Sequence, residues 1–331
     1  MTLDIIMLLA SLGLILLSCA IFVNAIEWFG KAFNLHQGIV GSILAAIGTA
    51  LPETIIPVLA ILFTKDISGH AIGIGAIAGA PFMLGTLGFF VTGSAVIVNK
   101  LLRRRTFEMH IDRSILSRDL LFFFVYYGIA VTATFYHDVH ALKWIVAVSL
   151  AASYALYLKM TIHGKAAEIK DVEELYATRF FKRETSVFWI TAQIIAGLAI
   201  MICGAHFFIN AVGLLSQSLG ASPLLLSLII TPVATELPEK LNSVIWIGRK
   251  KDTLALGNIT GAMVFQSCFP VTFGMIFTEW DLRGPTMVSA ACALGMALIT
   301  LVWVRITKTL SPFLLLFGGV LYAVFLLSVF L

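Results

Sequence analysis

The chain has 331 residues, of which 60% are hydrophobic and only 12% are charged. A soluble domain carries about 25% charged residues, so this composition excludes an ordinary soluble protein and indicates a polytopic membrane protein. The net charge of +4 does not favour a nucleic-acid partner, because the basic residues lie in short loops between apolar runs.

A transmembrane helix needs about 20 apolar residues. Ten such runs follow one another, near residues 3–23, 38–63, 71–98, 118–136, 141–160, 187–211, 222–247, 254–278, 285–304 and 310–331. The long polar segment after the fifth run holds five acidic and five basic residues. The sequence therefore predicts a first half at 1–163, a connector at 164–186 and a second half at 187–331.

The distribution of lysine and arginine predicts the orientation of these runs, since cytoplasmic loops carry the excess of basic residues. Alternate loops are rich in them, and the richest are 103–118, 165–183 and 249–251. We therefore expect an all-α protein of the plasma (inner) membrane, with a cytoplasmic connector and both termini outside the cytoplasm. Five spans in each half would make the two halves inverted repeats.

One short motif occurs in the second run and again in the seventh. The copies are Gly48-Thr49-Ala50-Leu51-Pro52-Glu53 and Ala234-Thr235-Glu236-Leu237-Pro238-Glu239. Proline removes a backbone donor and breaks a helix, and a carboxylate inside a membrane is costly and usually functional. Two broken helices that hold one cation are the interpretation we favour over two kinked helices whose carboxylates reach the headgroups.

A second motif lies one run later in each half. Gly75-Ala76-Ile77-Ala78-Gly79-Ala80 aligns with Gly257-Asn258-Ile259-Thr260-Gly261-Ala262. Small residues at this density let membrane helices approach closely. Close packing alone would explain one copy, but the matching positions in both halves favour descent from a repeat.

The residue types around the two prolines suit a hard divalent cation. Carboxylates of Glu53 and Glu239, with carbonyl oxygens freed around Thr49–Ala50 and Thr235–Glu236, would supply about six oxygen ligands. Ca²⁺ takes six to eight oxygens, whereas Mg²⁺ is smaller and loses its water reluctantly. This pattern therefore favours Ca²⁺.

These motifs resemble those of the sodium/calcium exchanger (calcium/cation antiporter) superfamily, prokaryotic type. The resemblance implies ten helices in two inverted halves, with helices 2 and 7 broken, and exchange of Ca²⁺ for Na⁺ or H⁺ by alternating access. It implies that Glu53 and Glu239 are the central ligands, beside the carbonyls of Thr49 and Thr235. No cofactor is expected; the partners are small inorganic cations and the lipid bilayer.

The chain departs from the family pattern at positions that would bind sodium. Where family members carry serine, the chain has Ala50, Glu236, Ala80 and Ala262, and where they carry a polar or acidic residue, it has Leu84 and Gln266. Gln266 is read equally as a ligand or as an interhelical hydrogen-bonding residue. We therefore do not carry coupling to three sodium ions over from the family.

The second half adds two charged residues next to the motif. Glu236, Glu239 and Lys240 are spaced to share one face of a continuous helix. We expect Lys240 to act as a tethered counter-cation where a relative would bind sodium. Alternatively, protonation of Glu236 couples transport to H⁺, or Lys240 reaches for the membrane surface.

Three functions remain open from the sequence. The first is a secondary antiporter of Ca²⁺, or a similar divalent cation, against H⁺ or Na⁺. The second is a non-transporting relative that binds a cation. The third is an intramembrane hydrolase, which lacks support because no nucleophile or metalloprotease motif is present. We therefore do not expect an enzyme.

Overall fold

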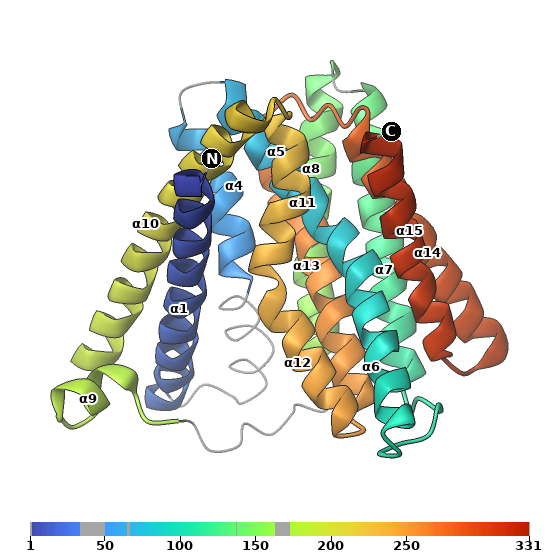
Figure 1. Cartoon of the computed structure of the whole chain (residues 1–331), viewed down its shortest axis with the longest axis horizontal. Helices are drawn as coiled ribbons and strands as arrows, with labels where there is room; N and C mark the ends of the chain where they lie inside the picture. Colours follow the sequence, from blue (N-terminus) through green and yellow to red (C-terminus); the bar gives the residue numbers. More distant parts are fainter. Residues whose placement is uncertain (1, 34–49, 65–66, 137, 163–172, 331) are drawn as a thin grey trace. The chain divides into compact units, whose positions relative to one another are not determined.

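The computed structural model describes residues 2–33, 50–64, 67–136, 138–162 and 173–330, and within these ranges the chain is helical without any strand (Figure 1). A π-helical turn at Leu84–Gly88 joins two of the helices, and a 3₁₀ turn follows another at Ala133–Tyr136. The α-helices are α1 (Thr2–Ala32), α4 (Leu51–Phe63), α5 (Ile67–Met83), α6 (Phe89–Leu101), α7 (Arg113–Thr132), α8 (His140–Ile162), α9 (Tyr176–Phe181), α10 (Val187–Leu219), α11 (Pro223–Thr235), α12 (Leu237–Gly248), α13 (Asp252–Phe277), α14 (Pro285–Thr307) and α15 (Pro312–Phe330).

Eight of the described helical segments are long and apolar enough to cross a membrane. They correspond to eight of the ten predicted runs. The seventh run is divided between α11 and α12, which confirms the predicted break there. The described part of the second run is the short helix α4, because residues 34–49 lie outside the described ranges. The all-helical membrane class is thus confirmed, while the count of ten spans and the inverted repeat stay predictions.

The chain divides into two compact units. Unit 1 comprises Met1–Ile72 and Ala155–Pro223, and unit 2 comprises Gly73–Tyr154 and Leu224–Leu331. Each unit takes segments from both halves of the sequence. These units group residues by their contacts. The division predicted from the sequence, at the connector, separates two repeats instead, and it stays a prediction.

Unit 1 is built on two long helices, α1 and α10, which lie side by side (Figure 1). A Cβ atom on Gly204 of α10 would come within 3.0 Å of the Ile15 side chain of α1, so glycine permits this close approach. Both helices extend beyond the apolar runs that the sequence shows. α1 continues through Glu27 to Ala32. A fall in hydropathy therefore does not mark the end of this helix.

The described part of the connector is attached to these two helices. Leu175 is fully buried against Ala25 and Ile190. The Gln193 side chain accepts the Ala177 N–H at 2.7 Å and donates to the Asn24 side chain at 2.9 Å. A segment that its charges predict to be a plain connector therefore has a small core and a polar anchor of its own.

Unit 2 holds the divided helix. α12 contacts α6 and α13, and α5 packs against the backbone of α11. A Cβ atom on Gly75 of α5 would collide with the Leu224 carbonyl oxygen and lie 3.1 Å from the Leu228 nitrogen. The small-residue motif of the first half thus serves close helix packing, as expected.

Candidate cation site

The break between α11 and α12 is a single residue, Glu236. Its N–H donates to the Pro232 carbonyl at 3.1 Å, and its own carbonyl accepts the Lys240 N–H at 3.2 Å. Pro238 has no N–H, so the usual donor to the carbonyl of Ala234 is missing. The expectation of a free carbonyl at Glu236 is therefore wrong, because the proline acts on the carbonyl four residues before itself.

Glu236 and Lys240 form a buried ion pair. The Lys240 Nζ lies 3.1 Å from Glu236 Oε2, and the two side chains are 13% and 0% exposed. Their i, i+4 spacing predicts this adjacency, and the one-residue break does not disturb it. Lys240 is thus directed at Glu236 rather than at the membrane surface.

Glu239 lies in the first turn of α12 and is buried. Its backbone carbonyl accepts the Ser243 hydroxyl at 2.9 Å and the Asn258 amide at 3.3 Å. The same hydroxyl lies 3.0 Å from the Ala255 carbonyl of α13, so its one proton is shared between the two carbonyls. Hydrogen bonds from α12 itself and from α13 therefore fix the start of α12, and they leave the Glu239 carboxylate out of this network.

Three buried side-chain oxygens of this region have no hydrogen-bond partner among the described residues: Glu236 Oε1, Glu239 Oε2 and Gln266 Oε1. The groups that act electrostatically on the Glu236 carboxyl are Lys240, Glu239 and Gln266, so these side chains are neighbours. Buried acceptors are normally satisfied, and an exception calls for a water or an ion. The arrangement suits a hard cation, which prefers oxygen ligands.

The second motif of this half also ties α13 to α7. The Thr260 hydroxyl donates to Asp119 Oδ2 of α7 at 2.9 Å, and Asp119 is 1% exposed. Arg118 pairs with the same carboxylate at 2.9 Å. Asp119 is not among the residues predicted from the sequence, although an acid in the fourth apolar run is a signal for a functional position.

The remaining candidates divide between the described and undescribed ranges. The Thr235 hydroxyl donates to the Thr231 carbonyl at 3.1 Å, which leaves the lone pairs of its own oxygen unused by this bond. Thr49 lies outside the described residues. Glu53 lies in the first turn of α4, in unit 1, and is 4% exposed. Among the described residues, no group of three or more His, Cys, Asp or Glu side chains stands ready to hold a metal ion.

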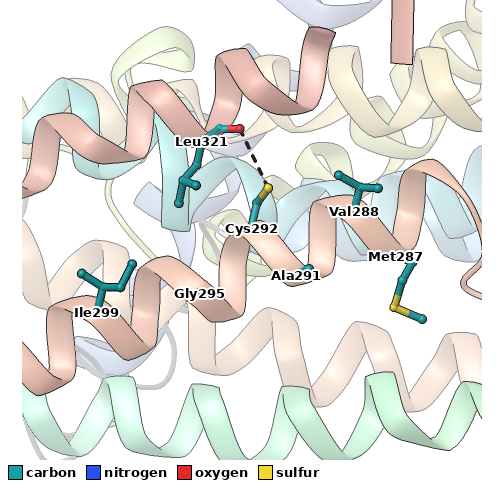
Figure 2. A pocket seen from close by; sticks show the side chains of 7 residues that line it. All are labelled: Met287, Val288, Ala291, Cys292, Gly295, Ile299 and Leu321. Atoms are coloured by element: carbon teal, nitrogen blue, oxygen red, sulfur yellow. Dashed lines mark hydrogen bonds between the residues drawn. The ribbon is translucent and has the colours of Figure 1, made fainter. Parts of the chain in front are cut away.

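A cavity of about 360 Å³ between α14 and α15 does not compete with this region (Figure 2). Its lining is apolar, and its polar contact is the Cys292 thiol, which donates to the Leu321 carbonyl at 3.9 Å. A cavity without oxygen ligands does not suit a hard cation.

Comparison with known proteins agrees with this architecture. The chain is 22% identical to an uncharacterised membrane protein of Methanocaldococcus jannaschii over 91% of this chain and 92% of the relative. Its fold is similar to the crystal structure of the H⁺/Ca²⁺ exchanger CAX, with a TM-score of 0.72, 15% identity, and coverage of 99% of this chain and 82% of the other. It is also similar to the sodium–calcium exchanger NCX_Mj, with a TM-score of 0.60, 21% identity, and coverage of 99% and 98%.

A family match extends over nearly the whole sequence. The family described as sodium/calcium exchanger protein matches residues 3–162 and 189–331, which leaves out the whole connector. Both Leu-Pro-Glu motifs and both small-residue motifs fall inside the matched ranges. The chain therefore belongs to the sodium/calcium exchanger family.

Proposed function

We propose that the chain is a secondary active antiporter that moves Ca²⁺, or a similar divalent cation, across the membrane in exchange for H⁺ or Na⁺. Family membership supports antiport, and the fold is shared with exchangers that are named for Ca²⁺. Alternating access would carry the ion from one side of the membrane to the other.

The observation that carries the proposal is the set of three buried, unpartnered oxygens on Glu236, Glu239 and Gln266. Because Lys240 offsets the charge of Glu236, the net charge of this set is that of Glu239 alone. The proposal adds Glu53 as a second carboxylate ligand, a role that the repeated motif gives it. Two carboxylates would neutralise one divalent cation, and carbonyl oxygens of Thr49 and Thr235 would complete the ligand set.

The residues around the carboxylates indicate how many counter-ions are exchanged for each divalent cation. Alanine stands at residues 50, 80 and 262, and leucine at 84, so hydroxyl and amide ligands for separate sodium ions are scarce. The Lys240 ammonium, 3.1 Å from Glu236, places a fixed positive charge beside the site. We therefore propose a low stoichiometry of counter-ion, with Glu236 and Lys240 as the coupling pair.

The test is transport by the purified full chain in liposomes. Na⁺ and pH gradients are imposed separately, and uptake of Ca²⁺, Mg²⁺ and Mn²⁺ is measured. We expect Ca²⁺ uptake, and we expect Glu53→Gln and Glu239→Gln each to abolish it. Glu279→Gln, which alters an exposed carboxylate between α13 and α14, is the matched control and should transport normally.

Two outcomes would contradict the proposal. Retained uptake in both carboxylate variants would remove Glu53 and Glu239 from the ligand set. Saturable Ca²⁺ binding by the wild-type chain without flux under either gradient would instead identify a non-transporting relative.

A further inference from the structure

A polar cavity of unit 2 lies where α6 and α12 end. It has a volume of about 390 Å³. Its lining includes four basic and two acidic residues: Arg103, Arg104, Arg105, Lys250, Glu108 and Asp252. With all six ionised, the formal sum is +2, which makes the cavity attractive to an anion.

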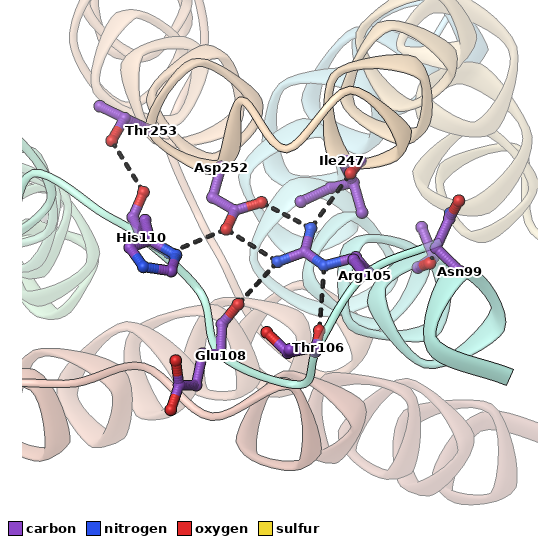
Figure 3. A network of polar contacts seen from close by, with 9 residues as sticks. Asn99, Arg105, Thr106, Glu108, His110, Ile247, Asp252 and Thr253 are labelled. Atoms are coloured by element: carbon purple, nitrogen blue, oxygen red, sulfur yellow. Dashed lines mark hydrogen bonds and ion pairs between the residues drawn. The ribbon is translucent and has the colours of Figure 1, made fainter. Parts of the chain in front are cut away.

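Arg105 lines this cavity and lies at the centre of the network of polar contacts in Figure 3. Its guanidinium forms a two-point ion pair with Asp252 at 2.7 and 2.8 Å. Its other N–H groups donate to the carbonyls of Thr106, Ile247 and Glu108 at 2.9 to 3.2 Å. All five donors of a guanidinium are thereby used, so Arg105 is not available to a ligand.

The same network makes the cavity rigid. Asp252 also accepts the backbone N–H of His110 at 2.8 Å, and the Thr253 hydroxyl donates to the His110 backbone carbonyl at 3.3 Å (Figure 3). The segment after α6 is therefore tied to both the end of α12 and the start of α13. A preorganised frame of this kind lowers the cost of ordering the side chains that it presents.

Three cations remain after Arg105 and Asp252 are paired. Arg103, Arg104 and Lys250 form no ion pair with any described residue, and all three are exposed at the cavity. Glu108 is the one remaining acid in the lining, which leaves the excess charge of +2 on these three residues.

Two of the three are also held in an unusual backbone conformation. Arg103 has φ of 58° and Lys250 has φ of 60°. The left-handed region disfavours side chains other than glycine, and asparagine or glycine would be the ordinary residue after a helix end. This conformation closes a helix end, α6 at Arg103 and α12 at Lys250, and so places both cations at the mouth of the same cavity.

Exposed apolar side chains lie beside the cavity. Leu101 and Leu102 directly precede Arg103 and are 74% and 56% exposed. The Phe107 ring contacts Phe313 with centroids 5.4 Å apart, and both rings are partly exposed. Exposed apolar side chains at the end of a membrane helix suit acyl chains, and the cations beside them suit a headgroup.

We propose that this cavity binds a phosphate-bearing anion, and that its source is the headgroup of an anionic phospholipid. Arg103, Arg104 and Lys250 contact the phosphate, while Arg105 and Asp252 hold the frame. The site is independent of the cation site and of the transport reaction.

The test is calorimetric binding to the detergent-solubilised full chain. The probes are dioctanoyl phosphatidylglycerol, dioctanoyl phosphatidylcholine and inorganic phosphate. We expect saturable binding of phosphatidylglycerol, with little binding of the other two. The Arg103→Gln/Lys250→Gln variant should raise the Kd roughly 30-fold, given the usual contribution of each basic residue near an anionic lipid.

The chain offers a closely matched control. Lys182 and Lys308 are also cations with positive φ, 51° and 58°, and neither lines this cavity. The Lys182→Gln/Lys308→Gln variant should bind phosphatidylglycerol as the wild type does. Equal weakening in both double variants, or no binding in the wild type, would overturn the site. Equally tight binding of inorganic phosphate would overturn the lipid as its source.

Discussion

The two Leu-Pro-Glu helices carry the same motif and are supported differently. In α12, Glu236 precedes the motif leucine and pairs with Lys240. The corresponding residues of α4 are Ala50 and Thr54, and the Thr54 hydroxyl donates to the Ala50 carbonyl at 3.0 Å. The second half thus has a buried ion pair where the first half has one neutral hydrogen bond.

The carbonyls of the two motif glutamates differ in the same way. Ser243 and Asn258 donate to the Glu239 carbonyl. The residue that corresponds to Ser243 is Pro57, which has no N–H to offer the Glu53 carbonyl. Ala76 corresponds to Asn258 and has no side-chain amide. Repeated sequence therefore does not imply repeated support: the second half is anchored by polar contacts, whereas the small-residue motif of the first half packs directly on backbone.

The largest expected effect comes from dividing the ion pair of α12. Lys240→Met leaves Glu236 buried without its partner, and breaking a buried pair costs about 3–5 kcal/mol. Unfolding of the detergent-solubilised chain should show this loss. The Lys240→Met/Glu236→Gln variant should recover most of it, because no isolated charge remains.

Thr54→Val in α4 is the matched control. It removes a hydrogen bond worth about 1 kcal/mol and no charge, so its destabilisation should be far smaller than that of Lys240→Met. Equal losses in the two halves would mean that the ion pair contributes nothing special.

The next effect distinguishes the two small-residue motifs. Gly75→Ala introduces a Cβ atom against the α11 backbone, and overpacking of this kind costs about 1–3 kcal/mol. At the matching Gly257, the nearest atom to a new Cβ is an Ile115 methyl at 4.0 Å. Gly257→Ala should therefore be neutral or stabilise by about 0.5–1 kcal/mol, as alanine does in a helix.

Thermal unfolding of both alanine variants in one detergent checks this pair. If Gly257→Ala proved as damaging as Gly75→Ala, the two motifs would share a packing role after all.

The smallest effect concerns the polar anchor of Glu239. Asn258→Ala removes one donor to its carbonyl, worth about 1 kcal/mol. The concentration of Ca²⁺ at half-maximal uptake should rise about fivefold, because the carboxylate is less firmly positioned. Ala76→Ser at the matching position should leave it unchanged, and a comparable rise there would contradict the proposed asymmetry.

Local features of this chain could be predicted from its sequence. The break at Glu236 follows from Pro238, and the Glu236–Lys240 pair follows from helical spacing. Length and hydropathy likewise predict the eight long helices. Each of these depends on residues a few positions apart, where helix geometry alone decides which groups meet.

Contacts between distant segments could not be predicted. Asn258 reaches the Glu239 carbonyl, and Thr260 reaches Asp119, from helices whose packing no periodicity specifies. Leu175 could not be distinguished, among the charges of the connector, as a residue that would be buried. Similarly, Arg105 is one of three consecutive arginines. Only the packed structure shows that Arg105 pairs with Asp252, while Arg103 and Arg104 are free to bind an anion.

The π-helical turn at Leu84–Gly88 has a consequence for how this span tolerates changes in length. Such a turn accommodates one more residue than an α-helix, and each residue of an α-helix corresponds to about 100° of rotation. Loss of a single residue within the turn would let the helix continue as a regular α-helix, without rotating α6 out of its contacts with α12 and α15. α13 contains no π-helical turn. A deletion there would rotate the rest of the helix by about 100° relative to its neighbours.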